Sequence, residues 1–385
     1  MYATLDGVAK TGTDKINMPR PTLFTTHIAE ISMQIHNRLL PILISFVAMF
    51  FCANVRAALF CVNSVAGLNF ALTTSQDNGQ NDQIDIVAGS YALNAGGLQF
   101  FSSEANSITI FGGYNADCSQ LTTAVTSLNG ENIYQVLRVI QSSTSAAASI
   151  HIERITFIAG KTGADGGGGL FATAQNGDVR IESNRFLLNH AENYAGAIYI
   201  NIGGLITLRN NLFYLNSALQ MGVGELQTSN SVAYITGNTM INNSAATVTN
   251  GIGGLYVESN SGTNFWLSNN ILWNNNANGG VDLYAGASVI LRNNDIGTSA
   301  FVLPNALSQN NQSVDPDFAP CVGLLCSSFE LKRGSPLVDA GIDNPPTGLG
   351  SYDLAGKLRT IGPHVDIGAF EEDVIFASGY EGGPF

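Results

Sequence analysis

The side chains best suited to acid–base chemistry are two acids and two arginines in the central part of the chain: Asp178, Glu182, Arg209 and Arg292. A pair of carboxylates can hydrolyse a glycosidic bond, and carboxylates can also hold a cation while an arginine removes a proton. Aligning the chain on a recurring Asn-x-apolar triplet puts Glu182 and Arg209 at equivalent positions of successive repeats. This placement favours an ion pair between repeats, worth about 0.2 to 1 kcal/mol at a surface, over a catalytic pair. The full column is Glu153, Glu182, Arg209, Thr236, Ser268 and Arg292.

Metal-binding patterns are missing from the sequence. His151 and His190 are isolated, and we interpret them as surface or turn residues. Neither they nor the cysteines have the spacing of a zinc site. Acids near the C-terminus could bind calcium, but no Asp-x-Asp-x-Asp-Gly calcium loop is present. We therefore expect no cofactor, and calcium is an alternative that no motif supports.

These candidate residues lie within a repeat of about 27 residues that runs from Ser149 to Gly297. Five asparagines begin the Asn-x-apolar triplets, and a second column of glycines keeps the same period. Two columns with one period are typical of a solenoid, and short apolar β runs make it a β-solenoid. The asparagines are Asn184, Asn211, Asn238, Asn270 and Asn294, and the glycines are Gly169, Gly196, Gly224, Gly254 and Gly280.

The period predicts an all-β fold, a parallel β-helix over residues 98–300 with seven or eight coils. We interpret the asparagine column as structural, because inward amides can hydrogen-bond along the rod and asparagine tolerates the left-handed backbone of a sharp corner. Residues 58–97 are expected to form an N-terminal cap and the first strands. Val65, Leu68 and Leu72 share one face of a short helix that would cover the exposed end of the first coil.

The N-terminal part has the features of a secretory signal. Residues 39–53 form an apolar run led by Arg38 and followed by small residues, and the run is too short for a comfortable membrane span. We expect residues 33–57 to be a signal peptide cleaved after Ala57, and residues 1–32 to be a spurious or disordered extension before a true start at Met33. The alternative is an uncleaved N-terminal anchor helix. The mature chain would be extracellular or on the outer cell surface, with the periplasm as another possibility, and would have no membrane span.

Charge and cysteine content support an exported chain. The 16 basic and 29 acidic residues give a net charge of −13, which makes nucleic acid an unfavourable partner. Removal of the signal leaves an even set of cysteines, which favours disulfides. Local pairing would join Cys61 to Cys118 and Cys321 to Cys326, although the sequence allows three connectivities. We expect a monomer.

The repeats resemble the right-handed parallel β-helix proteins of the pectate-lyase-like superfamily. A second resemblance covers residues 301–371, which are similar to the "choice-of-anchor Q" domain through VDPDF at 314–318, FELKRGSPLVDAG at 329–341 and VDIGAFE at 365–371. This family implies an exported bacterial surface protein with an irregular C-terminal capping lobe. The short tail, residues 372–385, contains DVIFASGYE, which resembles an ending found on exported proteins of some Gram-negative bacteria.

The C-terminal region also combines one arginine with several acids. Arg359 is surrounded in sequence by Asp339, Asp353, Asp366 and Glu371. An arginine paired with a carboxylate such as Asp366 would hold an irregular lobe together, so we interpret this set as structural.

Two classes of function remain. The first is a non-enzymatic protein that binds carbohydrate or adheres at the cell surface, with a polysaccharide or a cell-surface glycan as partner. The second is a polysaccharide lyase or glycoside hydrolase acting in a groove along the β-helix, as the fold resemblance implies. Aromatic residues that face outward along one side would form a stacking platform for sugar rings. The candidates are Tyr194, Tyr199, Tyr214, Tyr256, Trp266, Trp273 and Tyr284.

Overall fold

The computed structural model describes residues 57–163, 165–229, 231–246, 251–259, 264–275, 280–302, 307–321 and 328–372. All of them belong to one compact unit, Arg56–Phe385. The predicted extension 1–32, almost all of the signal segment 33–57 and almost all of the tail 372–385 lie outside the described residues. Among the described residues, no helix is long and apolar enough to cross a bilayer.

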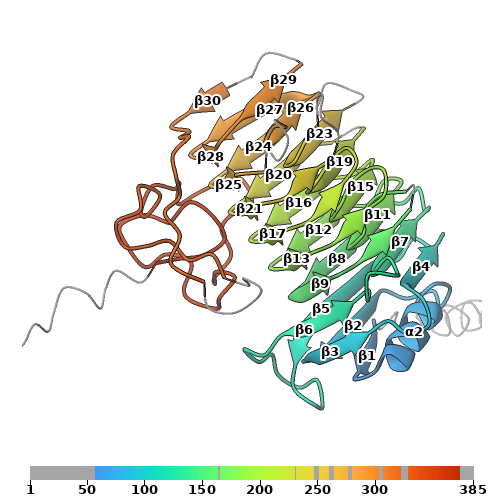
Figure 1. Cartoon of the computed structure of the whole chain (residues 1–385). Helices are drawn as coiled ribbons and strands as arrows, with labels where there is room; N and C mark the ends of the chain where they lie inside the picture. The colour runs from blue at the N-terminus through green and yellow to red at the C-terminus, as the bar shows by residue number, and fades with distance from the viewer. Residues whose placement is uncertain are drawn as a thin grey trace, which may run out of the picture. The chain divides into compact units, whose positions relative to one another are not determined.

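The chain folds as the predicted parallel β-helix (Figure 1). Each coil passes in turn through three sheets, here called sheets 1, 2 and 3, and a short corner sheet lies between sheets 2 and 3. Sheets 2 and 3 have eight strands each, which gives eight coils. In sheets 1 to 3 each described strand pairs in parallel with its equivalents in neighbouring coils, so these sheets have unpaired edges only at their two ends, whereas the corner sheet spans four coils.

The strands are short, as the sequence period requires. Sheet 1 contains β1 (Ala58–Val62), β2 (Asp82–Val87), β5 (Ile108–Tyr114), β8 (Ile150–Glu153), β12 (Val179–Glu182), β16 (Ile206–Arg209), β20 (Ala233–Thr236), β24 (Asn264–Ser268), β27 (Ser288–Arg292) and β30 (Leu307–Gln309). Sheet 2 contains β3 (Gly89–Ala92), β6 (Thr126–Asn129), β9 (Ile155–Ile158), β13 (Arg185–Leu187), β17 (Leu212–Tyr214), β21 (Thr239–Ile241), β25 (Ile271–Trp273) and β28 (Asp295–Ile296). Sheet 3 contains β4 (Leu98–Ser102), β7 (Leu137–Gln141), β11 (Leu170–Ala174), β15 (Ile198–Ile202), β19 (Gly224–Thr228), β23 (Leu255–Ser259), β26 (Leu283–Ala285) and β29 (Ser299–Phe301). The corner sheet contains β10 (Lys161–Thr162), β14 (His190–Ala191), β18 (Ser217–Ala218) and β22 (Ser244–Ala245).

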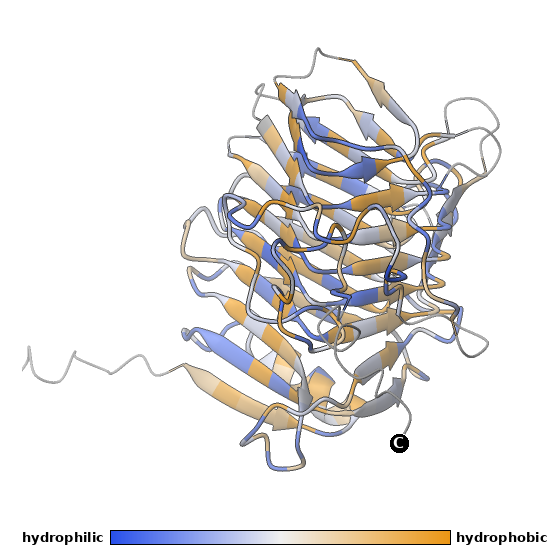
Figure 2. Ribbon diagram, turned by 90° about the vertical axis from the view of Figure 1, so that its left-hand side faces the viewer, coloured by the Kyte–Doolittle hydropathy of each residue, from blue (hydrophilic) through white to orange (hydrophobic). Residues whose placement is uncertain are grey.

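Alternation along the strands separates the core from the surface. Inward positions are apolar and fully buried, whereas outward positions vary, and Figure 2 shows this change of hydropathy along the strands. Equivalent side chains stack along the rod inside the core. The rings of Phe157, Phe186 and Phe213, for example, lie nearly parallel with centroids 4.8 Å apart. Identical inward residues in successive coils therefore form a continuous core, which is why the sequence period is so regular.

The five predicted asparagines form a hydrogen-bonded ladder at the corner between sheets 1 and 2. The amide oxygen of Asn184 accepts the backbone N–H of Ile155, and each later amide oxygen accepts the backbone N–H and a side-chain N–H of the ladder asparagine one coil earlier. Asn211 Oδ1 lies 2.9 Å from the backbone nitrogen of Asn184 and 3.2 Å from its Nδ2. The ladder members are all fully buried. They are Asn184, Asn211, Asn238, Asn270 and Asn294, and Asn311 follows.

The left-handed backbone at this corner lies one residue earlier than the sequence predicted. The ladder asparagines have ordinary φ angles, and the residues before them have φ between 49° and 62°. These residues are Ser183, Asn210, Gly237, Asn269 and Asn293. The ladder amide must point inward to its neighbour, so the residue before it adopts the positive φ that turns the chain.

A second amide ladder, which the sequence analysis did not find, lies at the corner after sheet 2. It contains Asn189, Asn216, Asn243 and Asn275, all buried. Its last member donates to a carboxylate, because Asp282 Oδ1 lies 2.7 Å from the backbone nitrogen of Asn275. Two parallel ladders thus fix two corners of the coils between Asn184 and Asn275.

Helix α2 (Val65–Thr74) covers the N-terminal end of the β-helix, as expected. Ser64 is its N-cap and accepts a hydrogen bond from the backbone of Gly67. Leu68 and Leu72 are buried against the first coil, which already contains strands of all three sheets. The predicted disulfide between Cys61 and Cys118 is confirmed, and it ties β1 to the loop after β5. Cys321 is also disulfide-bonded, whereas Cys326 lies outside the described residues.

The C-terminal region, residues 311–372, does not close the far end of the rod as a cap would. It returns along the side of the β-helix and packs on the outward face of sheet 2 (Figures 1 and 2). Most outward side chains of sheet 2 are apolar at these coils and are covered by this region, while the outward Arg185 and Thr239 make hydrogen bonds to its backbone. Leu212 and Ile241 contact Phe329 and Phe370 there, and Ile271 contacts Leu337. We call this region the flank lobe.

Candidate functional site

Sheet 1 carries polar and aromatic side chains on its outward face, in two columns. Alternate residues of a strand point to opposite faces, so each strand contributes two outward positions. The second column has the register that the alignment of repeats predicts. The first column is His151, Arg180, Thr207, Tyr234 and Trp266, and the second is Glu153, Glu182, Arg209, Thr236, Ser268 and Arg292.

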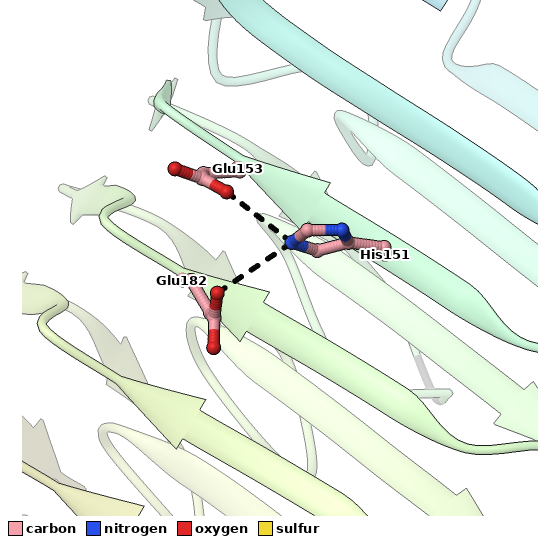
Figure 3. A group of neighbouring side chains, drawn as sticks. All are labelled: His151, Glu153 and Glu182. Carbon is pink, nitrogen blue, oxygen red and sulfur yellow. Dashed lines mark ion pairs between the residues drawn. The ribbon is translucent and has the colours of Figure 1, made fainter. Parts of the chain in front are cut away.

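Three of these side chains converge at the boundary of β8 and β12 (Figure 3). The imidazole of His151 points between the carboxylates of Glu153, on its own strand, and Glu182, on the next coil. Its Nε2 lies 3.3 Å from Glu153 Oε2 and 3.6 Å from Glu182 Oε2. The three potential ligand atoms all lie within 4.8 Å of one another. We call this set the His–Glu–Glu cluster.

Glu182 is the most buried member of the cluster, with only 5% of its surface exposed. Its Oε1 lies 3.0 Å from Arg209 Nη2 and 3.8 Å from Arg180 Nε. Burial by itself raises the pKa of Glu182, but the polar contact with His151 and the charges of Arg209 and Arg180 outweigh it and lower the pKa. The carboxylate is therefore ionised at neutral pH, and the ion pair with Arg209 that the sequence favoured is present.

His151 responds in the opposite direction. Burial by itself lowers its pKa, but the two glutamates raise it above the ordinary value. The ring also meets the edge of Phe111 on the preceding coil, with centroids 5.0 Å apart. With no other cation between the carboxylates, the geometry thus favours a protonated imidazole.

Arg209 connects this face to the flank lobe. Its Nη2 pairs with Glu182, and its Nη1 donates to the carbonyl oxygen of Thr347 at 2.9 Å. A guanidinium held at both ends has a fixed position. It is therefore suited to orienting Glu182 and unsuited to removing a proton from a substrate.

The other two predicted catalytic residues lie apart from this pair. Asp178 is exposed in the turn before β12, where its Oδ1 accepts the backbone N–H of Leu205 at 2.8 Å. Arg292 lies three coils beyond Arg209, with its guanidinium 5.6 Å from the ring of Trp266. The structure thus brings Glu182 and Arg209 together, and leaves Asp178 and Arg292 out of the arrangement.

Sheet 3 has a different outward face, dominated by aromatic rings. One column, here called the aromatic column, occupies the same strand position in six successive coils. The rings of Phe171 and Tyr199 stack with centroids 5.0 Å apart, and those of Tyr256 and Tyr284 meet edge to face at 5.4 Å. The column contains Arg138, Phe171, Tyr199, Glu225, Tyr256 and Tyr284.

A carboxyl group interrupts the aromatic column. Glu225 lies between Tyr199 and Tyr256 and is only 9% exposed. Burial, with a smaller contribution from the charge of Glu258 on the next coil, raises the pKa of Glu225 to about 7. Burial and the same glutamate also raise the pKa of Tyr256. Near neutral pH this carboxyl group can therefore donate or accept a hydrogen bond.

Tyr199, Tyr256 and Tyr284, three of the aromatic residues expected to form a platform, lie on this one face of sheet 3. Tyr194 is exposed in the turn just before β15. The rest are elsewhere: Trp266 is on sheet 1, while Tyr214 and Trp273 are covered by the flank lobe.

The C-terminal arginine and acids lie inside the flank lobe. Arg359 is 2% exposed, and its Nη1 lies 3.3 Å from Glu371 Oε1. It meets Asp366 through the backbone carbonyl, 3.5 Å from Nη2, while the Asp366 carboxylate accepts the backbone N–H of Asp339 at 2.7 Å. Burial raises the pKa of Glu371 to about 8. The arginine thus pairs with Glu371, and the arrangement holds the lobe together.

The sequence analysis did not single out Glu225 and Phe171, and it treated His151 as isolated. A signal for the aromatic column was available, because Phe171, Tyr199, Tyr256 and Tyr284 recur close to the repeat period. For His151 the signal was weaker: its partners are two residues and one coil away, and only the strand register shows that they share a face.

No family model, curated protein sequence or solved structure matches this chain. The resemblances to the pectate-lyase-like superfamily and to the choice-of-anchor Q domain therefore remain expectations.

Proposed function

We propose that this chain is an exported surface or secreted β-helix protein that binds carbohydrate through the outward face of sheet 3. The aromatic column is the observation that carries the proposal. Phe171 is buried and covered by Arg138 and Tyr199, whereas Tyr199, Tyr256 and Tyr284 are partly exposed along a rigid rod. The outer edges and hydroxyl groups of these tyrosines offer contacts in a line to an extended glycan. The rod holds these rings in place before binding, so little side-chain entropy is lost on association.

The charges on this face indicate the kind of glycan. Glu225 lies within the column and Glu258 lies beside it, whereas the one arginine of the column, Arg138, is 3.9 Å from the ring of Phe171 and pairs with Asp165. An acidic polysaccharide would place its carboxylates near these glutamates, which is unfavourable. A neutral glycan, whose hydroxyl groups can donate to Glu225, fits better.

A first experiment is a screen of neutral and acidic oligosaccharides by isothermal titration calorimetry. We expect a neutral oligosaccharide to bind, and Tyr256→Ala to weaken its binding at least tenfold. The matched control is Tyr234→Ala, which removes a tyrosine of the same size from sheet 1 and should leave affinity unchanged. Equal losses in both variants would refute this location for the site.

Hydrolysis of the bound glycan is a second candidate function, and Glu225 is the observation that favours it. A protonated Glu225 could donate its proton to a glycosidic oxygen, while the Glu258 carboxylate takes a proton from the attacking water. Reducing ends released by the wild type but not by Glu225→Gln would establish this activity. A lyase on sheet 1 has less support, because Arg209 is held by Glu182 and by the Thr347 carbonyl.

Export is supported by two features. The Cys61–Cys118 disulfide is typical of an oxidising compartment. The first strand starts at Ala58, directly after the proposed cleavage site. N-terminal sequencing of the protein recovered outside the cytoplasm should begin at Ala58, and a chain that still contains Leu43 would contradict the proposed processing.

A further inference from the structure

We propose that the His–Glu–Glu cluster on sheet 1 is a binding site for a divalent transition-metal ion, with His151 Nε2, Glu153 Oε2 and Glu182 Oε2 as ligands. The cluster lies on a different sheet from the aromatic column. Metal binding here can therefore be tested independently of carbohydrate binding on sheet 3.

The two distances from His151 Nε2 fit metal ligands better than they fit hydrogen bonds. Donors roughly 2.0 to 2.2 Å from a zinc ion at tetrahedral angles lie roughly 3.4 Å from one another. The two distances from His151 Nε2 to the glutamate oxygens are 3.3 and 3.6 Å. For an N–H···O hydrogen bond these distances are long.

Burial of the nitrogen supports the same conclusion. His151 Nε2 is shielded from solvent and lies between both carboxylates, but neither contact has hydrogen-bond geometry. A buried polar atom without a hydrogen bond is costly, and a bound cation would satisfy it together with both carboxylates. Figure 3 shows all three side chains directed at the same point between β8 and β12.

The surroundings hold the deepest ligand in place. Glu182 is 5% exposed and uses its two oxygens differently: Oε2 faces the cluster, and Oε1 faces Arg209 at 3.0 Å. Arg209 is in turn fixed by the carbonyl of Thr347. An outer group that orients a carboxylate ligand is a common feature of metal sites.

The charges near the cluster set the conditions for binding. The positive groups are Arg209 and Arg180, both on the far oxygen of Glu182, and His151 itself when it is protonated. Two carboxylates neutralise a divalent ion, so the arginines weaken the site without cancelling it. A metal must displace the proton of His151, and affinity should therefore rise with pH.

The ligand set indicates which metal fits. An imidazole with two carboxylates suits zinc and similar transition metals, whereas calcium takes six to eight oxygen ligands and magnesium keeps most of its waters. Three protein ligands also leave room for water on the metal.

The test is isothermal titration calorimetry of ZnCl₂ into the full chain after treatment with a chelator, at pH 6 and pH 8. We expect one zinc per chain, tighter binding at pH 8, and at least a tenfold loss of affinity in His151→Gln and in Glu153→Gln. Glu153 is partly exposed, so its variant should keep the fold if the buried substitution does not. His190→Gln is the matched control, because His190 lies on the corner sheet and contacts Ser217.

Each outcome bears on the proposal. Absence of zinc binding to the wild-type chain would overturn it, and so would a Glu153→Gln variant that binds zinc as tightly as the wild type. A loss in His190→Gln equal to that in His151→Gln would also overturn it, because binding would then be located elsewhere. Circular dichroism of each variant separates loss of binding from loss of fold.

Discussion

Asn211 in the first ladder offers a sharp test of how this rod is held together. Its Nδ2 donates to the carbonyl of Ile181 and to Asn238 Oδ1, each at 2.9 Å, and its Oδ1 accepts the backbone N–H of Asn184 at 2.9 Å. The side chain is fully buried, so no water replaces these partners. Replacing it with alanine removes a hydrogen bond from three buried groups: the Asn184 backbone N–H and the Ile181 carbonyl lose their side-chain partner, while Asn238 Oδ1 keeps the backbone N–H of residue 211.

The magnitude follows from those three groups. An unpaired buried donor or acceptor costs about 1 to 3 kcal/mol, and relaxation of the neighbours recovers part of the total. We therefore expect Asn211→Ala to lower the free energy of unfolding by about 2 to 4 kcal/mol. The assay is urea unfolding followed by circular dichroism, compared through the transition midpoint and slope.

The control is Asn176→Ala. Asn176 is exposed and makes one hydrogen bond, from Nδ2 to the carbonyl of Thr144 at 2.7 Å. Its loss should cost less than about 1 kcal/mol, because water replaces the amide. If Asn211→Ala shifts the unfolding midpoint no more than Asn176→Ala does, the amide ladder does not stabilise the rod and the reasoning fails.

Three further predictions concern charges and the disulfide. Burial raises the pKa of Asp295 from 3.8 to about 7, so the wild type loses stability as the pH rises from about 4 to about 7. Asp295→Asn does not titrate. Its free energy of unfolding, measured in urea and compared with that of the wild type, should therefore be up to about 4 kcal/mol more favourable at pH 8 than at pH 4. Arg359→Met leaves the buried Glu371 side chain without its partner. Because burial raises the pKa of Glu371 to about 8, this group takes up a proton near neutral pH, and we expect the flank lobe to lose about 1 to 3 kcal/mol, measured as faster proteolysis within residues 311–372. Cys118→Ser removes the disulfide to Cys61, which links residues 57 positions apart in the sequence. We expect the free energy of unfolding to fall by about 4 kcal/mol, and reductant added to the wild type should reproduce the effect.

The parallel β-helix was predictable because its residues repeat for a physical reason. Stacked coils need an apolar residue, an amide or a small residue at the same place each time, so the Asn and Gly columns are visible without any structure. The column from Glu153 to Arg292 was predictable for the same reason, since strand register follows once the corners are aligned. The exact residue in the left-handed conformation was not, because corner asparagines such as Asn210 and Asn211 are adjacent and alike in type.

The positions of the irregular parts were much less predictable. The sequence period does not predict that another part of the chain packs on the outward face of sheet 2, because Leu212 and Ile241 resemble ordinary core residues in the sequence. The flank lobe was therefore expected at the end of the rod. The convergence of His151 with Glu182 depends on side-chain direction between coils, which the sequence alone does not specify.

The location of carbohydrate binding can be measured directly by fluorescence. The chain has two tryptophans, Trp266 on sheet 1 and Trp273 under the flank lobe, and neither is on sheet 3. A Tyr256→Trp variant places a reporter in the aromatic column. The account predicts that a bound neutral oligosaccharide changes tryptophan emission in Tyr256→Trp and leaves wild-type emission unchanged. A change in the wild type with no additional change in Tyr256→Trp would contradict it.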